Sequence, residues 1–145
     1  MVYRYLNRET ELRVYDQDES ITAGLPEAAG FSETVSSDIV ILSVPISEME
    51  RVCREMIPHI REGQLFVDTC SVKTKPLGLM EELFPENVQI LGTHPLFGPD
   101  SGKDGIAGFK IVVCPVRVDE CTYQSVIGFL QGLDLVVVEA TAEEH

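Results

Sequence analysis

Along most of the chain, short continuous hydrophobic runs typical of strands alternate with stretches in which hydrophobic residues follow the spacing of a helix. Residues 38–44 contain Ile39-Val40-Ile41-Leu42, which is apolar on both faces, as is typical of a strand buried inside a parallel sheet. Further short apolar runs predict strands at residues 64–69, 88–91, 109–114 and 134–138. Strands and helices therefore alternate, which predicts a doubly wound α/β fold with a mostly parallel sheet and helices on both faces.

The predicted helices lie between these strands. One is expected to begin near Ser47, where Ser47 and Glu50 have the spacing of a capping box, and its apolar stripe includes Met49, Cys53 and Met56. The methionines of this stripe are interpreted as core residues. Two further helices are expected at residues 75–84 and 119–130.

The two ends of the chain are less regular. Residues 12–15 predict a strand, residues 19–29 a short helix weakened by Gly24 and Pro26, and residues 1–10 an irregular segment or a substitute strand at 2–6. Residues 139–145 resemble the start of a further helical domain. The 145 residues are thus interpreted as a single, partial domain.

Composition narrows the class of protein. Hydrophobic residues make up 44% and charged residues 24% of the chain, as in ordinary soluble globular proteins. The net charge of −13 argues against a nucleic-acid partner, which requires a basic surface. No apolar run approaches the roughly 20 residues of a membrane span, and the N-terminus has no secretory hydrophobic region, so we expect a cytoplasmic protein without a membrane partner.

The four cysteines are far apart and lack C-x-x-C spacing, so no metal site is expected. Cys70 and Cys114 fall within apolar strand patterns. We expect them to be buried free thiols in a reducing compartment.

Two polar clusters follow neighbouring predicted strands. One is Asp68-Thr69-Cys70-Ser71-Val72-Lys73, and the other runs through Thr93-His94-Pro95-Leu96-Phe97-Gly98-Pro99-Asp100-Ser101-Gly102. Pro95 and the glycines stiffen the loop that carries His94. A single loop histidine is more often solvated than catalytic, but the carboxyl ends of parallel strands meet at one edge, where ligands bind. Both clusters together favour a catalytic His94.

Asp16 follows the predicted strand at residues 12–15. In a dinucleotide-binding fold, an acidic residue at the end of the second strand accepts hydrogen bonds from the adenine ribose, and it favours NAD over NADP by charge. A solvated turn aspartate is the alternative.

The two polar clusters and the run Ile41-Leu42-Ser43-Val44-Pro45 make the chain resemble the prephenate/arogenate dehydrogenases of tyrosine biosynthesis, over roughly residues 12–144. The resemblance implies an oxidative decarboxylation with hydride transfer to nicotinamide (NAD, with NADP possible), on prephenate or arogenate. It implies that His94 accepts the proton of the substrate's ring hydroxyl and that Ser71 holds this hydroxyl and orients the histidine.

The resemblance also assigns residues around the catalytic pair. It places Ser43, Val44 and Pro45 along the cofactor cleft. Residues at the substrate rim are Lys73, Ser101 and Lys103.

Two family features are not found in this sequence. One is the first strand with its Gly-x-Gly-x-x-Gly turn, which holds the pyrophosphate and lies in the middle of a 3-2-1-4 sheet; the other is the C-terminal helical domain with the dimer interface and a substrate-binding arginine. The fold is therefore expected to be an N-terminally truncated Rossmann-like domain that self-associates through exposed sheet edges, or pairs residues 2–6 with 12–15. We expect the isolated chain to be inactive.

Two other functions fit the same alternation. The chain could be a truncated, non-catalytic Rossmann-like binding or interaction module. It could also be another Rossmann dehydrogenase, such as the 3-hydroxyacid type, although that reading leaves the Ser71 and His94 motifs unexplained.

Overall fold

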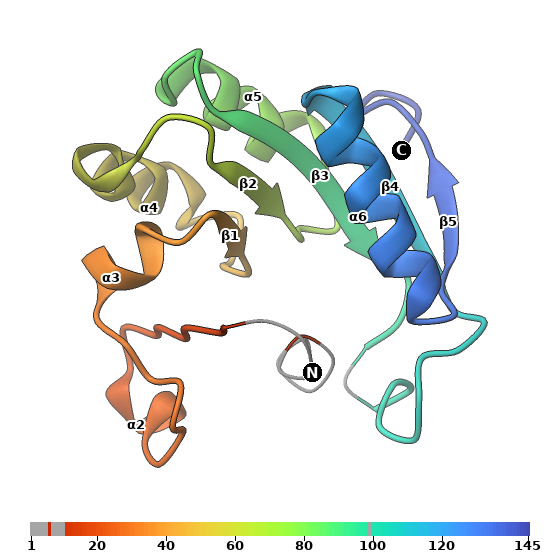
Figure 1. Cartoon of the computed structure of the whole chain (residues 1–145), viewed down its shortest axis with the longest axis horizontal. Helices are drawn as coiled ribbons and strands as arrows, with labels where there is room; N and C mark the ends of the chain where they lie inside the picture. Colours follow the sequence, from red (N-terminus) through yellow and green to blue (C-terminus); the bar gives the residue numbers. More distant parts are fainter. Residues whose placement is uncertain (1–5, 7–10, 99) are drawn as a thin grey trace.

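The structure, a computed structural model, describes residues 6, 11–98 and 100–145. Its centre is a five-stranded sheet in the order β1-β2-β3-β4-β5 (Figure 1). The strands are β1 (Ile39–Leu42), β2 (Leu65–Asp68), β3 (Gln89–Pro95), β4 (Lys110–Arg117) and β5 (Val136–Glu139). Only the β3–β4 pair is antiparallel, and the other neighbours are parallel. The prediction of a mostly parallel sheet is confirmed.

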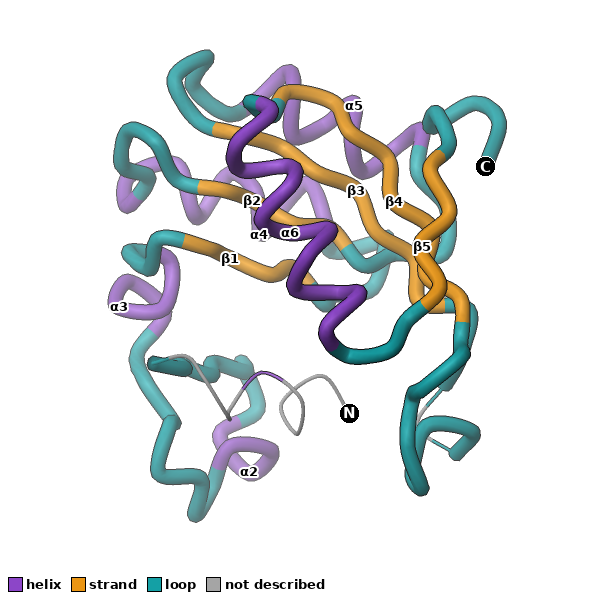
Figure 2. The backbone as a smooth tube through the Cα atoms, turned by 45° about the vertical axis from the view of Figure 1, so that its right-hand side comes forward, coloured by secondary structure: helices purple, strands orange, loops and turns teal. Residues whose placement is uncertain are grey.

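Helices cover both faces of this sheet. The helices α4 (Met49–Met56) and α5 (Thr74–Leu83) lie on one face, and α6 (Glu120–Gly132) lies on the other (Figures 1 and 2). A 3-10 turn, η1 (Ile57–His59), follows α4. This arrangement confirms the doubly wound α/β fold, which resembles a Rossmann domain.

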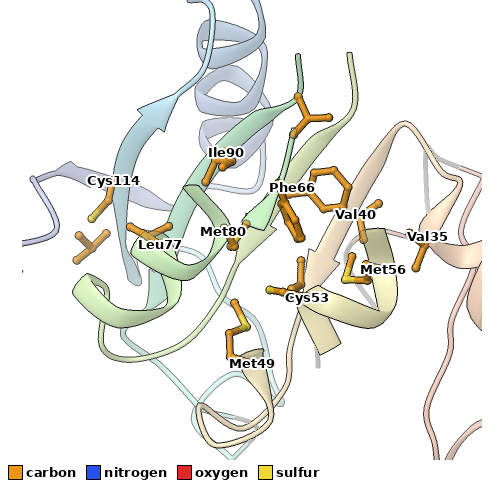
Figure 3. Packing of buried hydrophobic residues seen from close by; sticks show 14 residues of the cluster. Val35, Val40, Met49, Cys53, Met56, Phe66, Leu77, Met80, Ile90 and Cys114 are labelled. Atoms are coloured by element: carbon orange, nitrogen blue, oxygen red, sulfur yellow. The ribbon is translucent and has the colours of Figure 1, made fainter. Parts of the chain in front are cut away.

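The main core lies between the sheet and the pair α4/α5. The stripe Met49, Cys53 and Met56 is buried against Phe66 of β2, as the prediction of core methionines required (Figure 3). Phe66 is fully buried, and its ring is tilted against the ring of Phe84, with 4.7 Å between the two ring centroids. Burying one such aromatic side chain contributes about 1.5–3 kcal/mol, so this cluster fixes the positions of β1 to β3.

The capping box predicted at Ser47 and Glu50 is not formed. Helix α4 begins at Met49 after Glu48, which makes no side-chain capping bond. The backbone already turns before the helix, because the Glu48 amide donates to the Pro45 carbonyl at 2.9 Å. Ser47 therefore lies inside a turn and not at the helix boundary.

The strand predicted at residues 12–15 is reduced to a single isolated bridge, in which Val14 pairs with Ala28 in parallel. Its partner segment is only three residues long, since it lies between Pro26 and Gly30. The predicted helix at 19–29 is limited to α2 (Glu19–Thr22), and Gly24, at φ +83°, redirects the chain toward the unpredicted α3 (Phe31–Val35). Of the segment proposed as a substitute strand, residues 2–5 lie outside the described residues.

The outer edge of β1 has no strand beside it within the described ranges. Ile39 and Ile41, which alternate with the buried Val40 and Leu42, are 55% and 37% exposed, so the prediction of a strand buried inside the sheet is wrong for β1, which lies at the edge. They border an apolar groove of about 540 Å³ between the sheet and α6.

In the part of the chain that is described, no helix has the length and apolar character needed to cross a membrane.

Candidate active site

Three parallel strands end at the same edge of the sheet and bring the predicted site residues together. In the register, Leu42 lies beside Asp68, and Asp68 lies beside Gly92. Side chains also join the strand ends, since Thr69 Oγ1 donates to the Leu42 carbonyl at 3.0 Å and Thr93 Oγ1 donates to the Asp68 carbonyl at 3.0 Å. The segments carrying Ser43, Ser71 and His94 therefore share this edge.

His94 is the penultimate residue of β3, so it belongs to the strand and not to the loop that follows. The side chain is half-buried, and its Nδ1 lies 2.8 Å from Nε2 of His145. Desolvation lowers the pKa of His94, and the charges of His145 and Lys73 lower it further, while Asp68 acts in the opposite direction. The imidazole is thus neutral near pH 7 and able to accept a proton.

Ser71 lies in an exposed bend between β2 and α5. No hydrogen bond joins Ser71 to His94 within the described residues. Ser71 is exposed at this edge, and its role toward a substrate hydroxyl and His94 stays a prediction.

Lys73 does not stand at a surface rim. The side chain is only 2% exposed, its Nζ forms an ion pair with Asp68 Oδ2, and it donates to the Thr93 carbonyl at 2.6 Å. The other carboxylate oxygen of Asp68 accepts from the Cys70 amide at 2.9 Å. The predicted rim position of Lys73 is corrected to a position beneath the Ser71 loop, because the long side chain reaches inward to a buried carboxylate.

Ser43, Val44 and Pro45 follow β1 directly. Ser43 and Pro45 are exposed, while Val44 packs partly against the main core. Cys70 Sγ lies 3.5 Å from the Val44 carbonyl, so this segment runs beside the loop that carries Ser71. Its assignment to a cofactor cleft stays a prediction.

The other predicted residues lie in turns. Asp16 Oδ1 accepts from the Asp18 amide at 2.9 Å, the geometry of a turn aspartate, and its role toward a ribose stays a prediction. Ser101 Oγ accepts from the Gly98 amide at 2.9 Å, in the long segment between β3 and β4. Ser101 and Lys103 are exposed there, and their assignment to the substrate rim also stays a prediction.

The sequence interpretation missed His145 as a site residue. Within residues 139–145, interpreted above as the start of a further helical domain, the chain forms one capped turn. There the Thr141 amide donates to Glu144 Oε2 at 3.0 Å and the Glu144 amide donates to Thr141 Oγ1 at 3.2 Å. This capping box directs His145 toward His94. Its Thr-x-x-Glu spacing is visible in the sequence and is the signal that could have located the turn.

All four cysteines are free thiols. Cys114 is buried as predicted, whereas Cys70 is only half-buried because it follows β2 instead of lying within it. Burial raises the pKa of Cys53 to about 12 and that of Cys70 to about 11, so neither is a thiolate at neutral pH. Groups of three or more potential metal ligands do not occur among the described residues.

Comparison with known proteins identifies the family. A family described as "Prephenate dehydrogenase, nucleotide-binding domain" matches residues 8–138. The chain belongs to this family. A probable arogenate/prephenate dehydrogenase of Methanocaldococcus jannaschii is 36% identical over 110 residues, which cover 74% of this chain and 24% of that protein. Chloroplastic arogenate dehydrogenase 2 of Arabidopsis thaliana is 32% identical over 114 residues, covering 74% of this chain and 32% of that protein.

Solved structures agree on the fold. Prephenate dehydrogenase from Aquifex aeolicus superposes with a TM-score of 0.66 at 21% identity, covering 81% of this chain and 45% of that chain. The same enzyme has been solved in complex with hydroxyphenyl propionate and NAD+, with a TM-score of 0.64. The chain spans only about a quarter to a third of the length of the curated relatives cited above.

The residues of this domain fit one part of a dinucleotide. The edge formed by Ser43, Pro45 and Ser71 offers exposed polar and backbone groups at the carboxyl ends of parallel strands, where such cofactors bind. The Gly-x-Gly-x-x-Gly turn that would hold the pyrophosphate does not occur in the sequence.

Proposed function

We propose that this domain supplies the catalytic edge of an NAD-dependent prephenate or arogenate dehydrogenase, with NADP as the alternative cofactor. The observation that carries the proposal is a half-buried histidine with a lowered pKa, His94, on the same sheet edge as the exposed Ser71. The family match and its relatives support the reaction class. With four free thiols, the domain suits the reducing cytoplasm, which we propose as its compartment.

The contact with His145 supports a role for one nitrogen of His94 as the base. When Nδ1–H of His94 donates to Nε2 of His145, Nε2 of His94 keeps its lone pair and can accept the proton of the substrate's ring hydroxyl. Ser71 then binds the same hydroxyl from the neighbouring loop. A bound nicotinamide would take the hydride from the hydroxyl-bearing carbon, while loss of CO2 leaves an aromatic ring.

The cofactor is proposed to lie along Ser43, Val44 and Pro45, with its ribose near Asp16. Because no glycine-rich turn is present to hold the pyrophosphate, we expect the isolated chain to bind the cofactor weakly and not to turn over. Catalysis is therefore best tested where the rest of a dehydrogenase is supplied.

A hybrid enzyme provides that test. The matching region of the Methanocaldococcus jannaschii relative would be replaced by the corresponding residues of this chain, and NADH formation would be measured with prephenate and with arogenate. We expect turnover with at least one substrate, and we expect His94→Gln to lower kcat by about 10²–10⁴-fold. A folded hybrid that loses no activity through His94→Gln would overturn the proposal. Replacement of His59, which lies in η1, by Gln serves as the matched control.

A second proposed function is self-association through the outer edge of β1. It is supported by the exposed Ile39 and Ile41 and by the apolar groove beside them. We expect sedimentation velocity to show a concentration-dependent dimer that Ile41→Lys abolishes. Ile21→Lys is the control, because Ile21 is 64% exposed on α2, away from this edge. An unchanged distribution in Ile41→Lys would refute the interface.

A further inference from the structure

A buried ion pair lies directly beneath the two proposed catalytic residues. Asp68 is the last residue of β2 and Lys73 precedes α5, and both side chains are fully shielded from solvent. Asp68 Oδ1 accepts from the amide of Cys70, and Lys73 Nζ donates to the carbonyl of Thr93 at 2.6 Å. The pair thus links the residue before Ser71 to the residue before His94.

We propose that the Asp68–Lys73 pair is a positioning device that fixes the Ser71 loop against the strand that carries His94. The inference rests on the proposed function, in which the side chains of Ser71 and His94 bind one substrate hydroxyl. A loop and a strand that must present a serine and a histidine to the same atom need a rigid connection, since small displacements of reacting groups reduce rates strongly. The pair provides this connection through three side-chain contacts, and Thr93 Oγ1 adds a fourth link by donating to the backbone carbonyl of Asp68.

The sheet is shaped to let the lysine pass. A Cβ atom on Gly92 would lie 3.2 Å from Lys73 Cδ and 2.8 Å from Leu77 Cδ1. The strand β3 therefore carries no side chain where the lysine stem crosses it. Stability alone is a weak reason for such an arrangement, because a buried ion pair is often no more stabilising than apolar residues of similar volume.

The two charges of the pair also act on the pKa of His94, in opposite directions. Lys73 lowers the pKa of His94 and Asp68 raises it, so the intact pair leaves the proton affinity of the imidazole mainly to desolvation and to His145. Removing one partner upsets this balance in a known direction. This shift reports how close the pair lies to the imidazole, while the positioning role itself is read from amide exchange in the Ser71 loop and from kcat against KM.

The test uses the 145-residue chain and needs neither substrate nor cofactor. Histidine ring signals would be titrated by NMR, with the His94 signal assigned through His94→Gln, and amide hydrogen exchange would be measured at residues 70–72. The variants are Lys73→Met, Asp68→Asn and the uncharged double variant Asp68→Leu/Lys73→Met. Lys75→Met, an exposed lysine in the first turn of α5, is the matched control.

We expect Lys73→Met to raise the pKa of His94 and Asp68→Asn to lower it. In the double variant, the pKa should return toward the parent value while exchange at residues 70–72 becomes about tenfold faster, since the Cys70 amide loses its acceptor. The control should change neither quantity. Unchanged exchange in a folded double variant would overturn the proposal, and so would a double variant that cannot fold, because the pair would then be a requirement of the fold.

The hybrid enzyme separates this proposal from the proposed function. There, Lys73→Met should lower kcat with little change in KM. The acidic limb of the pH–rate profile should move to higher pH, because a base with a raised pKa remains protonated up to a higher pH. If His94→Gln leaves the hybrid fully active, the proposed function fails, whereas the NMR result on the isolated chain still decides the positioning role.

Discussion

Gly92 offers the most demanding test of the packing beneath the site. It lies in β3 with its neighbours on the α5 side, and an added methyl group would approach Leu77 Cδ1 to 2.8 Å, Leu77 Cδ2 to 3.1 Å and Lys73 Cδ to 3.2 Å. Leu77 is 2% exposed and enclosed in the main core, and the far end of Lys73 is held by Asp68 and Thr93. Neither neighbour can move away freely.

The size of the effect follows from two opposing contributions. Inserting a methyl group into a filled core costs about 1–3 kcal/mol. Replacing a strand glycine reduces the freedom of the unfolded chain and returns about 0.5–1 kcal/mol. We therefore expect Gly92→Ala to lower the free energy of unfolding by about 0.5–2 kcal/mol.

Urea unfolding followed by far-UV circular dichroism measures this quantity, since the chain has no tryptophan for fluorescence. Gly78→Ala is the matched control: Gly78 lies inside α5 with no atom within 4 Å of an added Cβ, so alanine should stabilise by about 0.5–1 kcal/mol. If both variants were equally stable or Gly92→Ala were the more stable, the close contacts at Gly92 would not exist.

Other predictions concern titration and reactivity. Because burial holds the pKa of His94 below 6.5, the unfolded chain binds this proton more tightly. The free energy of unfolding should therefore fall as the pH drops through and below 6.5, and less steeply in His94→Gln; equal slopes would contradict the burial of this ring. Ellman's reagent should modify the exposed Cys121 in the native chain, whereas the buried Cys53, with a pKa of about 12, should react only after unfolding. Rapid native modification that persists in Cys121→Ser would contradict this order.

Much of the central sheet could be predicted from the sequence. The strand β2 is a short apolar run that the fold buries on both faces, as predicted from its pattern. The similar run in β1 forms a strand too, but at the edge of the sheet and with one face exposed. The prediction of a strand at residues 12–15 was wrong, because so short a segment depends on its partners. Whether a four-residue segment forms a strand depends on its neighbours, and Val14 finds only Ala28.

The sequence was sufficient to predict which edge of the sheet carries the candidate site. Because the neighbouring strands β2 and β3 are parallel, they end at the same edge of the sheet, and this places the segments that carry Ser71 and His94 together. The position of Lys73 was not predictable, because it depends on the buried carboxylate five residues earlier and on the space above Gly92. His145 lies 51 residues from His94 along the chain, and only the folded turn brings the two rings together.

The most direct test of a cofactor site at this edge is an NMR titration of the isolated chain with NAD+, repeated with NADP+. We expect the amide signals of Ser43, Val44 and Ser71 and the ring signals of His94 to shift together, with a dissociation constant on the order of 1 mM for NAD+ and weaker binding for NADP+. Asp16 is the reason for this preference, since its carboxylate would face a 2′-phosphate. Shifts confined to other surfaces, or none at a concentration about tenfold higher, would contradict a cofactor site at this edge and favour the interaction module.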